Sequence, residues 1–146
     1  MQVKHILTPI DFSENSDKAV AFAAKLAESL SATLHVVHIY QLPMYVVPDG
    51  GFVMGDELGS KLKAASEEAV NRFISERGFY GVTMKAHVLC GLPHEAILRI
   101  ADELDVDMII MGTHGRAKLS RVLLGSVAEK VVRTSNVPVI VVPNEA

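Results

Sequence analysis

The chain has 146 residues, a single cysteine and a formal net charge of −3 at pH 7. A chain of this length buries enough apolar surface to fold as one domain without a metal, and one cysteine excludes an intramolecular disulfide. The lack of a basic tail and the aromatic content of 5% argue against nucleic-acid binding. Pro9 and Asp11 interrupt the amino-terminal apolar run, which argues against a signal peptide or membrane insertion. We therefore expect residues 1–146 to form one domain of a cytoplasmic protein.

Short β-branched runs alternate along the chain with longer segments in which apolar residues recur every three or four positions. The short runs predict strands at residues 3–8, 33–40, 83–89, 108–111 and 138–142. The longer segments predict helices at residues 13–30, 58–78, 93–104 and 126–134, the first of them capped by Ser13 or Ser16. Residues 41–55 hold two prolines and three glycines, which predicts a loop. Its apolar side chains suit a lid over a ligand, a partner contact or packing on its own domain.

Strict alternation of strand and helix, with strands that are apolar throughout, indicates a parallel sheet covered by helices on both faces. Right-handed crossovers then restrict the fold to doubly wound α/β forms. In such sheets ligands bind beyond the carboxyl ends of the strands, where the strand order reverses. We therefore expect a five-stranded parallel sheet with its ligand site at that edge.

Residues 112–126 leave the fourth predicted strand and lead into the last predicted helix. Gly112 and Gly115 lack side chains, so that backbone N–H groups can approach a phosphate and the backbone can adopt positive φ. Gly125 and Ser126 lie at a helix amino terminus, where free N–H groups favour an anion. The Ser126 hydroxyl can donate to a phosphate or cap the helix. Glycines between a strand and a helix are also ordinary turn residues, and neither the P-loop nor the dinucleotide-binding motif is present.

The spacing Gly-x2-Gly-x9-Gly-Ser, filled by Gly112, Gly115, Gly125 and Ser126, resembles the ATP-binding signature of the universal stress protein family. Further similar segments run from end to end of the chain: HILTPIDFS, LHVVHIY, GLPHEAI, DMIIMGTHGR and SNVPVIVVP. On this resemblance the sequence is identified as a member of the ATP-binding, UspA-like subgroup. It implies a Rossmann-like sheet in the strand order 3-2-1-4-5. It also implies ATP, ADP or AMP as the ligand, with Mg²⁺ or Mn²⁺ left open.

The same resemblance implies the positions of the nucleotide contacts. Asp11 would lie near the ribose or its metal ion, whereas the residues alone leave it open as a nucleotide ligand or only a helix cap. The backbone of Ile39 would read the adenine, and the amide of Val127 would contact a phosphate. The other expected contacts are Pro9, Ile10, Met111, His114 and Arg116. Three basic residues at 116–121 would attract a triphosphate or form a solvated surface.

Other candidate sites are weak. His35 and His38 lie three positions apart in a strand and therefore point to opposite faces, which argues against a shared metal ion. Cys90 ends the third predicted strand, where we expect a small buried apolar residue. No histidine or cysteine cluster has the spacing of a zinc site.

Three functions remain open on these grounds. The first is a nucleotide-responsive regulatory module of the stress response, acting on an unknown protein partner. The second is a slow ATPase or another adenine-nucleotide enzyme, for which Asp11 is the one candidate general base, so efficient hydrolysis is not expected. The third is a dimeric interaction module that binds no nucleotide. The resemblance implies a homodimer through residues 138–142, an edge strand in the family's order; an edge covered by residues 143–146 is the alternative.

Overall fold

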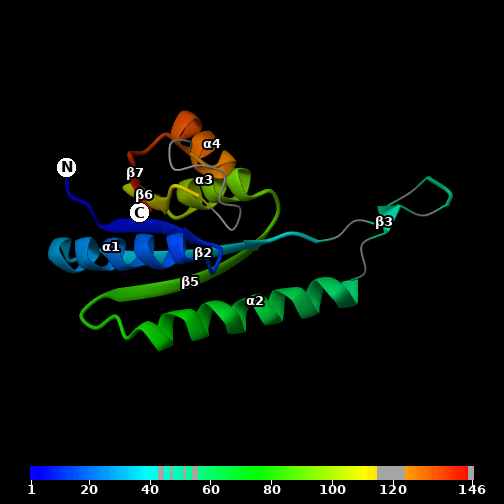
Figure 1. The fold of residues 1–146 in the computed structure, drawn as a ribbon, viewed down its shortest axis with the longest axis horizontal. Helices are drawn as coiled ribbons and strands as arrows, with labels where there is room; N and C mark the ends of the chain where they lie inside the picture. The colour runs from blue at the N-terminus through cyan, green and yellow to red at the C-terminus, as the bar shows by residue number, and fades with distance from the viewer. Residues whose placement is uncertain (43–44, 47, 51, 54–55, 115–123, 145–146) are drawn as a thin grey trace.

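The computed structural model describes residues 1–42, 45–46, 48–50, 52–53, 56–114 and 124–144 (Figure 1). Its elements in chain order are β1 His5–Ile10, α1 Glu14–Leu30, β2 Thr33–Tyr40, β3 Tyr45–Val46, β4 Phe52–Val53, α2 Asp56–Arg77, β5 Thr83–Cys90, α3 Pro93–Glu103, β6 Met108–Gly112, α4 Ser126–Thr134 and β7 Val139–Val142. Five strands form one sheet in the order β5-β2-β1-β6-β7, and every pair in it is parallel. The predicted order 3-2-1-4-5 is therefore confirmed.

Helix ends follow local signals in the sequence. The Oγ of Ser13 accepts a hydrogen bond from the backbone N–H of Ser16 at 3.3 Å, which makes Ser13 the N-cap of α1. Pro93 occupies the first turn of α3, where its missing N–H costs no hydrogen bond. Gly78 follows the last residue of α2 with a φ of +58°, the conformation that ends helices and favours glycine.

Two predictions about strands were wrong in detail. The first strand spans residues 5–10 rather than 3–8, because Pro9 lies beyond the register that β1 shares with β6 and its missing N–H is tolerated there. The segment 41–55 contains the antiparallel pair β3 and β4 in addition to loop. Pro48 and Asp49 lie in a turn between the two strands and are followed by Gly50, whose φ of +83° favours glycine.

Two hydrophobic cores lie on opposite faces of the sheet because neighbouring residues of a strand point to opposite sides. The helices α1 and α2 cover one face and α3 and α4 cover the other. In β1, for example, Ile6 packs in the first core and Leu7 in the second. The doubly wound architecture is therefore as predicted. Figure 1 shows the amino-terminal part of α2 projecting beyond the sheet with β3. Among the described helices, none is long and apolar enough to cross a membrane.

Three histidines from three strands form a hydrogen-bonded chain across the sheet. The Nδ1 of His5 lies 3.1 Å from the Nε2 of His35, and the Nδ1 of His35 lies 2.9 Å from the Nε2 of His87. His35 is only 3% exposed. Burial, reinforced by His87, His5 and Lys85, lowers the pKa of His35 to about 4. Burial and Lys85 also lower the pKa of His87.

The prediction that His35 and His38 face opposite sides is confirmed, since His38 packs on Phe12 in the core formed by α1 and α2. The prediction of a buried Cys90 was wrong. Cys90 is exposed because it is the last residue of β5, an edge strand of the sheet.

Candidate functional site

A cavity of about 300 Å³ opens at the carboxyl ends of β1, β2 and β6 and reaches the first turns of α3 and α4. The connections that follow β1 and β6 pass over opposite faces of the sheet, so the cavity lies at the point where α/β sheets usually hold ligands. Most of the predicted contacts line it: Pro9, Ile10, Asp11, Ile39, Met111, Gly112, His114, Gly125, Ser126 and Val127. Gly115 and Arg116 lie outside the described residues.

Further lining residues were missed by the sequence analysis. Ser16 reaches the cavity from α1, Thr113 follows Gly112, and Pro93, Ile97 and Ala128 come from α3 and α4. The right-handed crossover that places α3 over this face would have indicated Pro93 and Ile97. No sequence pattern indicates Ser16, because it reaches the cavity only through the conformation of the turn between β1 and α1.

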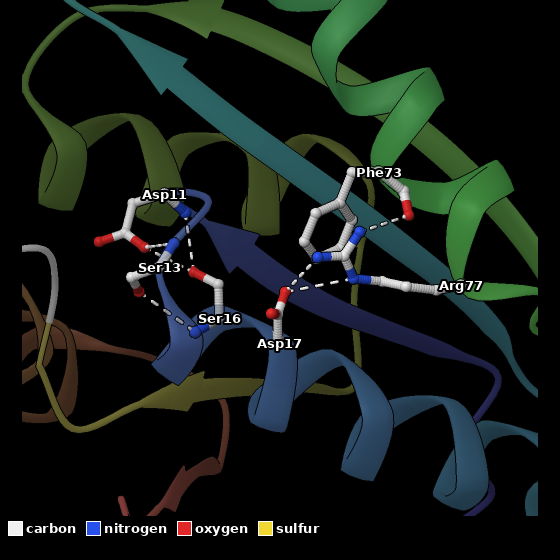
Figure 2. A network of polar contacts seen from close by, with 6 residues as sticks. All are labelled: Asp11, Ser13, Ser16, Asp17, Phe73 and Arg77. Carbon is white, nitrogen blue, oxygen red and sulfur yellow. Dashed lines mark hydrogen bonds and ion pairs between the residues drawn. The ribbon is translucent and has the colours of Figure 1, made fainter.

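The carboxylate of Asp11 takes part in the start of α1 and also lines the cavity. Its Oδ1 accepts hydrogen bonds from the Ser16 hydroxyl at 2.7 Å and from the Ser13 backbone N–H at 3.0 Å. The backbone N–H of Asp11 donates to the Ser16 Oγ at 2.8 Å. Figure 2 shows these bonds and the second carboxylate oxygen directed away from Ser13 and Ser16. Asp11 is not the cap of α1, because Ser13 is its N-cap, and the contact of Asp11 with a nucleotide stays a prediction.

The turn after Asp11 is held by aromatic packing. Phe12 has a φ of +65°, a strained conformation for a bulky residue. Its ring packs on His38 and Phe73 at centroid distances of 4.6 and 6.0 Å. Arg77 lies 3.5 Å above the Phe73 ring and pairs with Asp17 of α1, as Figure 2 shows. These contacts between α2 and α1 fix the turn that carries Asp11.

Gly112 and the residues after it form the neck of the glycine loop, defined here as residues 112–114. A Cβ on Gly112 would lie 3.1 Å from the Cβ and 3.2 Å from the backbone oxygen of Asn15. Gly112 does not adopt positive φ, so the conformational freedom of glycine is not used at this position. Its missing side chain instead allows the close approach of α1. The Asn15 side chain then donates from Nδ2 to the His114 carbonyl oxygen at 2.9 Å.

The first turn of α4 borders the cavity directly. Gly125 is the N-cap of α4, and because glycine has no side chain, no side-chain hydrogen bond caps this helix. Of the two roles left open for Ser126, the helix cap is therefore wrong, because Gly125 holds that position; Ser126 lines the cavity, and its contact with a phosphate stays a prediction. The Gly125 N–H donates to the Thr113 carbonyl oxygen at 2.6 Å, which joins the neck to the start of α4. The N–H groups of this first turn make the helix end suitable for an anion.

Polar groups at the site are few. The Nδ1 of His114 lies 3.0 Å from the Oγ1 of Thr113, and its Nε2 is buried with no hydrogen-bond partner among the described residues. The described residues hold no group of three or more histidine, cysteine or acidic side chains that could bind a metal ion. Asp11 is the one predicted metal ligand, and it would fit a hard cation only together with phosphate oxygens.

The sheet is parallel and doubly wound, and a cavity at its switch point is bordered by the glycine neck and the first turn of α4. These features define the α/β class that holds ligands at the carboxyl edge of the sheet. The chain belongs to the universal stress protein family, whose sequence model matches residues 2–143. The family prediction is therefore confirmed, while the ATP-binding subgroup stays a prediction.

The chain is similar to known members of this family over nearly its whole length. Universal stress protein MJ0577 of Methanocaldococcus jannaschii is 37% identical over 153 residues, which cover 95% of this chain and 94% of the relative. A solved structure of hypothetical protein MJ0577 has a TM-score of 0.74 at 30% identity and covers 99% of both chains. The universal stress protein from Archaeoglobus fulgidus in complex with dAMP has a TM-score of 0.61 at 26% identity, covering 97% of this chain and 98% of that one.

Proposed function

We propose that this protein binds an adenine nucleotide in the cavity at the carboxyl edge of the sheet and acts as a nucleotide-responsive regulatory module of the stress response. ATP is the expected ligand, with ADP and AMP as alternatives. The observation that carries the proposal is that contacts predicted from three separated stretches of sequence converge on one cavity. The Archaeoglobus fulgidus relative in complex with dAMP supports an adenine nucleotide as the ligand.

The chemistry of the cavity walls suggests how the nucleotide would lie. Apolar groups of Pro9, Ile10 and Ile39 suit the adenine ring. Asp11 suits the ribose hydroxyls because a carboxylate accepts hydrogen bonds from them. The first turn of α4, with Gly125 and Ser126, suits the phosphates. A divalent cation, Mg²⁺ or Mn²⁺, would neutralise phosphate charge when bound, with Asp11 as its protein ligand.

Binding without efficient turnover suits these groups best. Asp11 is the one candidate general base that the sequence offers, and one of its carboxylate oxygens already accepts hydrogen bonds from Ser13 and Ser16. A nucleotide that binds one conformation of the loop better than another would shift the surface offered to a protein partner. A slow ATPase is the competing function, and the fate of bound ATP separates the two.

We also propose a cytoplasmic homodimer in which residues 1–146 act as one domain. The strand β7 is an edge strand with β6 as its neighbour in the sheet. Its four residues are all aliphatic and partly buried, which suits pairing with the same strand of a second copy. Coverage of this edge by residues 143–146 is the alternative.

Isothermal titration calorimetry tests the ligand. ATP, ADP, AMP and GTP are each titrated into the protein with and without Mg²⁺. The proposal expects saturable binding of the adenine nucleotides and much weaker binding of GTP. Chromatography of the ATP sample after several hours detects ADP if the protein is a slow ATPase. Absence of binding for every adenine nucleotide would overturn the proposal and favour a nucleotide-free interaction module.

A further inference from the structure

We infer that Asn15 is a positioning residue for the phosphate end of the cavity, because it holds the neck of the glycine loop against the first turn of α1. The inference rests on the proposed function and adds a residue that none of the predicted contacts includes. Asn15 does not line the cavity, so it would act through the neck and not by touching the nucleotide.

Asn15 is held in place by packing and by a hydrogen bond. It is 4% exposed, and its Nδ2 donates to the His114 carbonyl oxygen at 2.9 Å across 99 positions of sequence. The backbone and Cβ of Asn15 also lie so close to Gly112 that a Cβ there would approach to within 3.1 Å. The residue therefore contacts both ends of the neck.

Asn15 and Ser16 are the buried polar residues of α1, and both lie in its first turn. The buried residues of the later turns are all apolar: Ala19, Val20, Ala23, Ala24 and Ala27. The Oδ1 of Asn15 is buried and has no hydrogen-bond partner among the described residues, a situation that costs stability. Packing alone would be served better by an apolar residue. The amide is therefore explained by its donor group, which satisfies the His114 carbonyl.

The effect of Asn15 reaches the anion-binding end of the cavity through one further bond. The Thr113 carbonyl, next to the His114 carbonyl, accepts the Gly125 N–H at 2.6 Å. Gly125 is the N-cap of α4. Asn15 thus fixes the neck, and the neck fixes the start of α4. The neighbouring residue Ser16 fixes Asp11 instead, so consecutive residues of α1 hold the two walls of the cavity.

Asn15 and Ser16 hold different walls of the cavity, so each should affect the binding of a different part of the nucleotide. Loss of the Asn15 donor should weaken contacts to phosphates and leave contacts to the base and ribose unchanged. ATP and adenosine share the base and ribose but differ in the phosphates. The ratio of their affinities therefore reports on Asn15 in a way that general destabilisation does not.

The test compares Asn15→Ala and Asn15→Leu with the natural protein by calorimetry of ATP and adenosine. Asn15→Leu preserves the branched side-chain shape but removes the donor without adding a charge, so it remains informative if Asn15→Ala folds poorly. We expect ATP affinity to fall by about tenfold in both variants, the loss of one buried hydrogen bond, while adenosine affinity changes by less than about twofold. The exposed residue Asn71 of α2 provides the matched control, Asn71→Ala, which should change neither affinity.

Equal losses for ATP and adenosine would reduce Asn15 to a structural role, and unchanged ATP affinity would remove its role altogether. Amide hydrogen exchange at residues 112–114 gives a readout that needs no nucleotide. We expect exchange there to accelerate in both variants, and unchanged protection would overturn the inference. If the natural protein binds neither ATP nor adenosine, the proposed function fails, and hydrogen exchange still decides whether Asn15 holds the neck.

Discussion

The side-chain amide of Asn15 donates a hydrogen bond to the carbonyl oxygen of His114, 2.9 Å away and 99 positions later in the chain. This bond ties the exit of β6 to the first turn of α1. The next residue, Ser16, ties the exit of β1 to the same turn through Asp11. The two halves of the cavity come from different strands, and one helical turn sets their spacing.

The close contact of Gly112 with Asn15 makes a stability prediction. Gly112→Ala places a methyl group 3.1 Å from the Asn15 Cβ, so we expect the free energy of unfolding to fall by about 1–3 kcal/mol through overpacking. Gly59→Ala is the matched control, since a Cβ at Gly59 in α2 would meet Leu42 at an ordinary 3.6 Å. That change should stabilise the protein by about 0.5–1 kcal/mol through helix propensity. Urea denaturation measures both, and equal shifts of the same sign would contradict the steric explanation.

The ion pair of Arg77 should contribute more than an exposed pair on the same helix. Arg77 stacks on Phe73 and binds Asp17 of α1, and its side chain is 29% exposed. We expect Arg77→Ala to reduce the free energy of unfolding by about 1–2 kcal/mol, because stacking and side-chain packing are lost with the charge. Arg72→Ala, which removes an exposed pair with Glu68, should cost less than about 0.5 kcal/mol. Thermal unfolding of the two variants measures the difference, which should vanish if both pairs are merely solvated.

The histidine chain of His5, His35 and His87 limits how many protons this face of the sheet can bind. Each bond between two ring nitrogens holds one proton, and only the Nε2 of His5 and the Nδ1 of His87 lie outside the two bonds. Neutral imidazoles bring one proton each, so the intact chain has room for one additional proton. A second would force two N–H groups to face each other and break the chain.

This arrangement predicts lower stability in acid. The folded-state pKa of His35 is about 4, below the ordinary value of 6.5. Between those two values the unfolded chain binds more protons than the folded one, so stability falls as the pH falls. Each unit of difference between the two pKa values corresponds to about 1.36 kcal/mol. We therefore expect the free energy of unfolding to fall by about 2 kcal/mol between about pH 7.5 and pH 5. Urea denaturation at both pH values checks this.

Substitution separates His35 from the other histidines. His35→Gln retains a hydrogen-bonding side chain that does not titrate in this range, so the pH dependence should flatten. His94→Gln on α3, outside the chain of histidines, is the matched control. If the natural protein has the same free energy of unfolding at about pH 7.5 and pH 5, the low pKa of His35 in the folded state is contradicted.

The doubly wound parallel sheet could be predicted from sequence because each strand and helix carries its own local pattern and crossovers are right-handed. The order of its strands came from the resemblance to the universal stress protein family. The place of the cavity followed from that order and from the glycines at 112 and 125. The histidine chain could not be predicted, since His5, His35 and His87 meet only through strand register. The bond of Asn15 was equally hidden, because it depends on how closely α1 approaches Gly112. The short β3–β4 pair was missed because prolines and glycines obscured its few strand residues.

The glycine motif itself is tested by Gly115→Val. A β-branched side chain there would occupy the path that the resemblance assigns to the phosphates, so we expect ATP binding to be lost while the fold is preserved. Circular dichroism verifies the fold and calorimetry the binding. A folded Gly115→Val protein with the ATP affinity of the natural chain would refute the assignment of residues 112–126 to phosphate binding.

Native mass spectrometry of the purified protein, before and after addition of ATP with Mg²⁺, tests the central claim most directly. We predict a dimer that gains about one nucleotide per chain, as expected for a ligand in excess of its dissociation constant. A protein that stays empty at millimolar ATP would contradict nucleotide binding and would make the glycine neck a structural feature of an interaction module.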